Sequence, residues 1–272
     1  MLRTRGLTKD FGGLTAVDSV DFELGTELCS LIGPNGAGKT TFFNLLTGVL
    51  DPTAGTVSLR RGDDWEDITD ASPHETAQRG VHRSYQVTNV FPERTVLENV
   101  RVAEQAAGGD SMTVWRNVDH FEGYTERAYA KLDRVGLADR AEDPASTLSH
   151  GAKRKLEVAI ALAGDPSVLL LDEPNAGVSS ESVDEVRDLI RDVADDHAVL
   201  LVEHNMDIVM DVSDRVVVLH QGAVIADGPP EDVRANPDVQ SAYLGGYEPG
   251  TLDETTTGDA TDDESTDSGG VA

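Results

Sequence analysis

The sequence is poor in cysteine, which limits its covalent chemistry. Cys29 is the single cysteine among 272 residues, so no disulfide can form within the chain. It lies inside the apolar stretch Leu28–Ile32, and burial in apolar surroundings keeps a thiol protonated and inert. We therefore expect Cys29 to be a buried structural side chain.

Long apolar runs are also missing. No hydrophobic segment approaches the about 18–20 residues that a membrane-spanning helix needs. The first residues, MLRTRGLTKDFGG, lack the apolar centre of a secretory signal peptide. From the sequence we expect a cytosolic protein, or one that a partner holds at a membrane.

Basic residues are scarce. Lys and Arg total 22 against 50 Asp and Glu, which gives a formal net charge of -28. Residues 247–272 contain eight acids and no Lys or Arg, so residues 1–246 still carry -20. Nucleic-acid-binding proteins normally present a basic face, so we expect no nucleic-acid partner. Because salt screens such self-repulsion, we expect a surface suited to a high-salt cytoplasm; an ordinary acidic cytosolic protein is the alternative.

Short apolar runs alternate with amphipathic stretches along most of the chain. This alternation predicts an α/β fold with a largely parallel sheet. Gln221-Gly222 is predicted to form a hairpin turn between Val216–Leu219 and Ala223–Ile225. The other predicted strands are Val17–Leu24, Leu28–Ile32, Thr56–Leu59, Val168–Asp172 and Ala198–Glu203. The predicted helices are Thr40–Thr47, Val96–Gln105, Gly151–Ala163, Ser182–Val193 and Met206–Val212.

The chain divides into regions of different character. Roughly the first sixty residues are rich in strand-forming patterns, whereas residues from about 88 to 163 are predicted to be mostly helical and to form a subdomain. Residues 247–272 are rich in Thr, Ser, Gly and Asp and have little to bury, so we expect an acidic disordered tail.

Residues 33–41, GPNGAGKTT, fit the phosphate-binding pattern G-x-x-x-x-G-K-[ST] between an apolar strand and a helix. The glycines allow successive backbone N–H groups to face a phosphate, and the helix N-terminus favours an anion. Lys39 is expected to reach the β- and γ-phosphates, and the Thr40 hydroxyl to bind Mg²⁺. The nucleotide-binding candidates here are Gly33, Pro34, Asn35, Gly36, Ala37, Gly38, Lys39, Thr40 and Thr41. Kinases, GTPases, helicases and recombinases share this loop, so it leaves the class open.

The segment Val168–Pro174, VLLLDEP, ends an apolar strand with two carboxylates. Ligands of α/β proteins bind at this carboxyl edge of the sheet. Asp172 is therefore a candidate for holding Mg²⁺ through water, and Glu173 for the general base that polarises the attacking water.

The segment Leu148–Glu157, LSHGAKRKLE, begins an amphipathic helix with Ser149 and Gly151. Alone, it is an ordinary helix N-cap. Between a P-loop and VLLLDEP, it resembles the signature sequence of ABC ATPases. The resemblance implies that the signature of one subunit covers the ATP in the P-loop of another, so that the active site requires a dimer.

Other segments resemble the remaining motifs of this family, in order. Gln86 matches the Q-loop glutamine, which contacts Mg²⁺ and water and reports to the membrane subunits. Asn175–Val178 matches the D-loop, and His204 the switch histidine at the γ-phosphate. Phe11 matches the aromatic residue that stacks on adenine, with a core aromatic as the alternative, and Val17 is expected to pack near the base.

The resemblance covers residues 2–246 and is closest to the ATPases of branched-chain amino acid importers, with urea importer ATPases as near relatives. The residues that carry it are Phe11–Leu14 with Ala16-Val17, the stretch from Gln86 to Val100, Ala176–Val178 and Ala242–Gly245. Ala152 stands where the signature usually has glutamine, Lys153 where it often has one, and Asn175 replaces a more usual threonine. The effect of Ala152 and Lys153 on the rate of ATP hydrolysis stays open.

The resemblance implies a P-loop NTPase with a RecA-like α/β core, an antiparallel β-subdomain and a helical signature subdomain. It implies ATP and Mg²⁺, two permease subunits, a second ABC ATPase subunit of the same or a related kind, and indirectly an extracellular solute-binding protein. The chain would then act at the cytoplasmic face of the membrane. Soluble ABC ATPases of DNA repair are less favoured, since they carry long coiled coils that this sequence lacks. Translation-associated ABC proteins normally have two cassettes in one chain, whereas this chain has one. A binding module with a vestigial ATP site is disfavoured because the full catalytic set is present.

Overall fold

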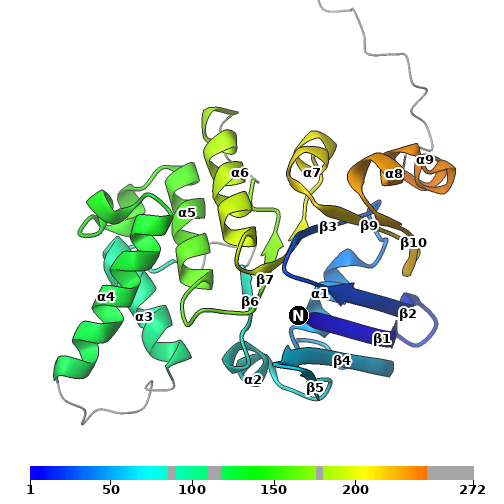
Figure 1. The fold of residues 1–272 in the computed structure, drawn as a ribbon, viewed down its shortest axis with the longest axis horizontal. Helices are drawn as coiled ribbons and strands as arrows, with labels where there is room; N and C mark the ends of the chain where they lie inside the picture. The colour runs from blue at the N-terminus through cyan, green and yellow to red at the C-terminus, as the bar shows by residue number, and fades with distance from the viewer. Residues whose placement is uncertain (85–89, 109–117, 176–179, 244–272) are drawn as a thin grey trace, which may run out of the picture.

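The structure is a computed structural model, which describes residues 1–84, 90–108, 118–175 and 180–243. Its first sheet is antiparallel, with strand order β2-β1-β4-β5 (Figure 1). These strands are β1 (Leu2–Asp10), β2 (Thr15–Leu24), β4 (Ala54–Arg61) and β5 (Asp64–Asp67). The strand-rich character predicted for the first sixty residues is confirmed.

The second sheet has six strands in the order β10-β9-β3-β8-β7-β6, parallel except for β10, which pairs antiparallel with β9. These strands are β3 (Leu28–Ile32), β6 (Val81–Ser84), β7 (Val168–Asp172), β8 (Ala198–Val202), β9 (Arg215–His220) and β10 (Ala223–Gly228). Every residue of β3 and β8 is buried. Such continuous apolar runs are typical of parallel strands that are covered on both faces.

The two faces of the parallel sheet are covered differently (Figure 1). On one face, α1 (Lys39–Leu46) and the antiparallel sheet share a buried core with β3, β7 and β8. On the other lie α6 (Ser180–Ala194), α7 (Met206–Val212) and α8 (Pro230–Ala235), followed by α9 (Pro237–Tyr243). Cys29 is completely buried, as predicted, and burial raises the pKa of its thiol to about 12.

The chain between β6 and β7 is mostly helical and lies beside the β6 edge of the sheet (Figure 1). Its helices are α3 (Val96–Ala107), α4 (Val118–Arg134) and α5 (His150–Ala161), with short 3₁₀ turns at Ala138–Arg140 and Ala145–Thr147. α3 begins at a capping box in which Thr95 and Glu98 bond each other's backbone N–H groups. A short helix, α2 (Pro73–Gln78), precedes β6.

The hairpin turn predicted at Gln221-Gly222 is confirmed: both residues have positive φ, 50° and 84°, and they join β9 to β10. Strand β1 was not predicted individually. Its pairing with β2 shifts register between Thr4 and Leu7, around Gly6 with φ 54°, and this interrupts the alternation by which a strand is recognised. No helix in the described part of the chain is long and apolar enough to span a membrane.

Candidate active site

The candidate site lies where neighbouring parallel strands end. The register pairs Leu31 of β3 and Asp172 of β7 with Val202 of β8, so the segments that follow these strands emerge at one edge. Those segments carry the P-loop, Glu173 and His204. Together with the β1–β2 turn they line a cleft of about 670 Å³. This is the edge at which open α/β sheets bind ligands.

The P-loop turns tightly between β3 and α1. Gly33 and Gly38 have φ of 153° and 105°, and Gly38 is the N-cap of α1. A Cβ on Gly38 would come within 2.2 Å of the Ala16 carbonyl oxygen, so a glycine is required there. The loop residues Asn35 to Thr41 line the cleft.

Lys39 begins α1 with its side chain almost fully buried. Its ammonium donates to the carbonyl oxygens of Gly33, at 2.6 Å, and Pro34, at 3.2 Å. Burial lowers the Lys39 pKa, and the nearby carboxylates of Glu173 and Asp172 oppose that shift. The ammonium is thus held across the loop in which a phosphate chain would lie.

Phe11 sits in the turn between β1 and β2. Asp10 accepts hydrogen bonds from the N–H groups of Gly12, at 2.6 Å, and Gly13, at 3.2 Å, and these bonds lower its pKa. The turn leaves Phe11 53% exposed and lining the cleft, which argues against the alternative of a core aromatic.

Val17 does not lie with Phe11. Its side chain is completely buried in the core under the antiparallel sheet, and its neighbour Ala16 lines the cleft instead. The reason is strand alternation, because successive side chains of β2 point to opposite faces. Ala16 therefore replaces Val17 as the residue of this pair that borders the site.

Glu173 follows the end of β7 in a strained backbone conformation, with φ 50°. Its N–H donates to the carbonyl oxygen of Val202 at 2.9 Å, which fixes the turn to the end of β8. Its carboxylate Oε1 lies 2.6 Å from Nε2 of His204. Positive φ in a non-glycine residue is costly and concentrates at functional sites.

Glu203 was not singled out from the sequence, although it is buried beside the site. Its carboxylate accepts from the backbone N–H of Asn175 at 3.1 Å, from the Asn175 side-chain amide at 2.9 Å and from the N–H of His204 at 3.3 Å. It therefore joins the segment after Glu173 to the one that carries His204. The available signal was an acid directly after an apolar strand.

Arg83 was also missed. Its guanidinium donates to Asp172 Oδ2 at 2.7 Å and to the side-chain oxygen of Asn44, on α1, at 2.7 Å. The Arg83 and Asp172 side chains are only 8% and 14% exposed. Asp172 is therefore already paired in this structure, whereas the sequence predicted for it a role at Mg²⁺ only.

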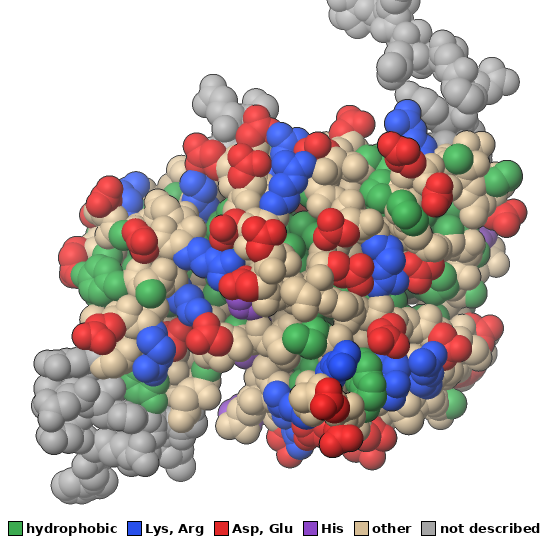
Figure 2. All heavy atoms as spheres, viewed as in Figure 1, with side chains coloured by type: hydrophobic (Ala, Val, Ile, Leu, Met, Phe, Trp, Pro, Cys, Tyr) green, Lys and Arg blue, Asp and Glu red, His purple; other side chains and the backbone are tan. Residues whose placement is uncertain are grey.

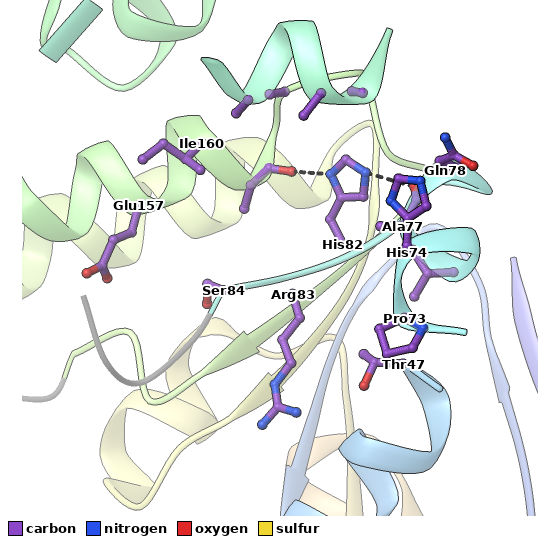
Figure 3. A pocket seen from close by; sticks show the side chains of 16 residues that line it. Thr47, Pro73, His74, Ala77, Gln78, His82, Arg83, Ser84, Glu157 and Ile160 are labelled. Atoms are coloured by element: carbon purple, nitrogen blue, oxygen red, sulfur yellow. Dashed lines mark hydrogen bonds between the residues drawn. The ribbon is translucent and has the colours of Figure 1, made fainter. Parts of the chain in front are cut away.

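Arg83 also lines a second cavity, a groove of about 460 Å³ that α2, β6, α3 and α5 enclose (Figure 3). His82 and Arg83 leave β6 in opposite directions. The two His82 ring nitrogens lie 2.8 Å from the carbonyl oxygen of Ala161 and 3.1 Å from that of Ala77, so His82 links β6 to α5 and α2.

The signature residues are placed apart from the P-loop of their own chain. Ser149 is the exposed N-cap of α5 and accepts from the Ala152 N–H at 3.3 Å. Among the described residues, neither Ser149 nor Gly151 lines the cleft that holds Lys39. Gln86 and Ala176–Val178 lie outside the described residues.

The donor set suits Mg²⁺. Thr40 and Asp172 both line the cleft, and no group of three or more His, Cys, Asp or Glu in the described residues could hold a metal by itself. Mg²⁺ characteristically takes one or two carboxylates and completes its shell with waters and substrate phosphates.

Comparison with known proteins decides the family. Residues 17–176 match the family described as ABC transporter. The chain belongs to the ABC transporter ATPase family. A second match, to the family described as branched-chain amino acid ATP-binding cassette transporter, covers residues 223–249 of this ABC ATPase.

Relatives of this ABC ATPase include the high-affinity branched-chain amino acid transport ATP-binding protein LivG of Escherichia coli, 42% identical over 90% of this chain and 98% of that protein. BraF of Pseudomonas aeruginosa is 41% identical over 90% of this chain and 98% of its own length. The probable branched-chain amino acid transport ATP-binding protein LivG of Archaeoglobus fulgidus is 36% identical over 90% of this chain and 95% of its own length.

Among solved structures, a nucleotide-free ATP-binding cassette from an ABC transporter superposes with a TM-score of 0.77. Its sequence is 28% identical to this chain, and the match covers 98% of that structure and 89% of this chain. An ADP conformation of such a cassette gives the same TM-score and identity. The predicted fold class is confirmed.

Proposed function

We propose that this ABC ATPase powers the import of branched-chain amino acids. The observation that carries the proposal is its similarity, over 98% of their length, to proteins named as ATP-binding subunits of high-affinity branched-chain amino acid transport. The match of residues 223–249 to a family described by the same substrate adds support. Urea or amide import is the alternative that the signature sequence left open.

Hydrolysis follows from the residues of the cleft. The ATP phosphates bind to the N–H groups of the P-loop and to Lys39, which exchanges its loop carbonyls for phosphate oxygens. Thr40 and Asp172 would hold Mg²⁺ together with Gln86, and the bound ion would neutralise developing phosphate charge. Glu173 orients and deprotonates the attacking water, and His204, in contact with its carboxylate, adjoins the γ-phosphate.

Dimerisation completes this mechanism. Ser149 and Gly151 lie away from their own P-loop, which supports a site in which they cover the ATP of another subunit. ATP then bridges two subunits, and loss of the γ-phosphate removes the bridge. Two permease subunits would convert this cycle into alternating access, a shift between states of different ATP affinity.

The apolar groove beside β6 supports the placement of a permease contact. It is lined by Ala103, Ala106 and Ala107 of α3 and by Ile160 and Ala161 of α5. It also borders Ser84, which shortly precedes Gln86 in the chain. A permease bound there would hold the chain at the cytoplasmic face of a membrane. The acidic composition favours a high-salt cytoplasm, and an extracellular solute-binding protein would deliver the substrate.

Uptake of labelled leucine, valine and urea tests the substrate. Deletion of the gene should abolish high-affinity leucine and valine uptake and leave urea uptake unchanged. The wild-type gene should restore uptake, and the matched Glu173→Gln gene should not, because it retains the fold and loses the base. Unchanged leucine and valine uptake, or selective loss of urea uptake, would contradict the proposal.

A further inference from the structure

The Arg83 side chain ties together three elements around the nucleotide cleft. It extends from β6 on the side opposite His82 (Figure 3). Its guanidinium lies 5.4 Å from the centre of the Phe43 ring, bonds Asn44 next to it on α1, and pairs with Asp172 at the end of β7. These contacts fix the guanidinium against the carboxylate expected to meet Mg²⁺.

Both carboxylates at the end of β7 contact basic side chains without a nucleotide. Arg83 pairs with Asp172 at 2.7 Å, and His204 contacts Glu173 at 2.6 Å. The Lys39 ammonium lies close enough to both carboxylates for each to raise its pKa. A divalent cation that entered this cleft alone would meet the Asp172 carboxylate, whose charge Arg83 already offsets and whose Oδ2 already accepts a hydrogen bond from Arg83.

We propose that Arg83 is a positioning residue that makes metal binding depend on nucleotide binding. It holds Asp172 in a fixed orientation and opposes a cation there, so that Mg²⁺ binds firmly only when ATP phosphates supply further negative ligands. The inference rests on the proposed role of Asp172 at the metal. Its physical basis is Coulombic, because the ion pair is shielded from water and a positive charge nearby weakens cation binding.

Mn²⁺ binding to the purified full-length protein tests this, with Mn²⁺ as a spectroscopic probe for Mg²⁺. Free Mn²⁺ is measured by electron paramagnetic resonance, with and without a non-hydrolysable ATP analogue. Arg83→Gln should tighten Mn²⁺ binding without nucleotide on the order of tenfold, as expected for removing one nearby charge. The difference in Mn²⁺ affinity between the protein with and without the ATP analogue should therefore become smaller in this variant.

Arg79→Gln is the matched control. It also removes one arginine charge and one ion pair, with Glu66 at 2.9 Å, and Arg79 does not line the cleft. Its Mn²⁺ affinity should stay within about twofold of the wild type. Unchanged or weaker Mn²⁺ binding by folded Arg83→Gln protein would overturn the proposal.

Removal of one partner of a buried ion pair can unfold a protein, so circular dichroism accompanies each titration. Arg83→Lys is the second variant, because it keeps the charge. Its Mn²⁺ affinity should stay within about threefold of the wild type, and a tenfold loss would mean instead that Arg83 builds the metal site. Asp172→Asn separates the two proposals: if it leaves nucleotide-dependent Mn²⁺ binding unchanged, the metal site itself is misplaced.

Discussion

Glu173 combines a strained backbone with a short contact to a second catalytic candidate. Its φ of 50° costs conformational energy, of the order of 1–3 kcal/mol for a residue in such a region. The hydrogen bond from its N–H to Val202 holds that conformation, and its carboxylate reaches His204. The strain therefore presents the carboxylate at the edge of the cleft, where the proposed mechanism places the general base.

Replacement of Glu173 by glutamine should separate binding from turnover. Glu173→Gln should bind ATP with nearly unchanged affinity and lower the hydrolysis rate by about two to four orders of magnitude, the range for loss of a general base. Phosphate release and binding of a fluorescent ATP analogue give the two quantities. Glu142→Gln, which alters an acid that bonds Tyr129, should hydrolyse ATP normally. A near wild-type rate for Glu173→Gln would remove it from the mechanism.

At the residue scale, the sequence was informative where a motif fixes both residue type and spacing. Lys39, Thr40, Asp172, Glu173 and His204 were predicted, and all five line one cleft. Arg83 and Glu203 were missed because their importance arises from contacts between segments far apart in the chain. Val17 was assigned to the cleft without regard to strand alternation, which directs it into the core.

At the scale of elements, two glycines of the P-loop share a left-handed backbone but differ in the space around them. Gly38 has φ 105°, and a Cβ there would approach the Ala16 carbonyl oxygen to 2.2 Å. Gly36 has φ 81°, but a Cβ added at Gly36 would meet no atom of the described chain within 4 Å. The two glycines thus offer a matched pair that separates a steric clash from backbone strain alone.

Gly38→Ala should destabilise the nucleotide-free protein by about 2–5 kcal/mol, because strain and overpacking add. Gly36→Ala should cost only about 1–2 kcal/mol, the penalty for a left-handed residue. Denaturant-induced unfolding without nucleotide provides both values. Equal losses in the two variants would contradict the close packing of the P-loop against Ala16.

Elements with an unbroken apolar run or helical periodicity were the easiest to predict. β3, β7 and α7 have the predicted bounds, because their apolar runs or periodicity are uninterrupted. β5 and β6 are only four residues long and partly exposed, so their sequences carry no clear pattern. The α8 and α9 helices are also short, at six and seven residues, and were not predicted.

At the scale of the whole molecule, acids outnumber the bases that could pair with them. Arginines already hold several carboxylates, as Arg134 does with Asp192 and Asp196. Acidic side chains nevertheless remain spread across the face shown in Figure 2, with Lys and Arg interspersed. On this face the acidic side chains are therefore spread out and are not gathered in one patch.

Salt should stabilise the protein. Raising KCl from 0.1 M to 1 M shortens the Debye length from ~10 Å to ~3 Å, which screens repulsion between the acidic side chains. The melting temperature should therefore rise across this range, and NaCl should act like KCl at equal ionic strength. A melting temperature that stays flat or falls would contradict a surface suited to high salt.

The central claim is that each ATP is bound by the P-loop of one subunit and the signature of another. Lys39→Ala should disable a P-loop, and Ser149→Arg should disable a signature by placing a bulky cation at the ATP of the partner. In a covalently linked dimer, the two lesions can be placed in different halves or in the same half. The two linked dimers carry identical substitutions, so only the arrangement of the lesions differs.

Steady-state ATP hydrolysis by these two linked dimers is the decisive measurement. Lesions in different halves leave one composite site with both defects and the other with none, so hydrolysis should be measurable. Lesions in the same half damage both composite sites, so hydrolysis should fall to the level of a dimer that carries Lys39→Ala in both halves. Equal hydrolysis by the two arrangements, or activity only when both lesions share one half, would contradict the composite site.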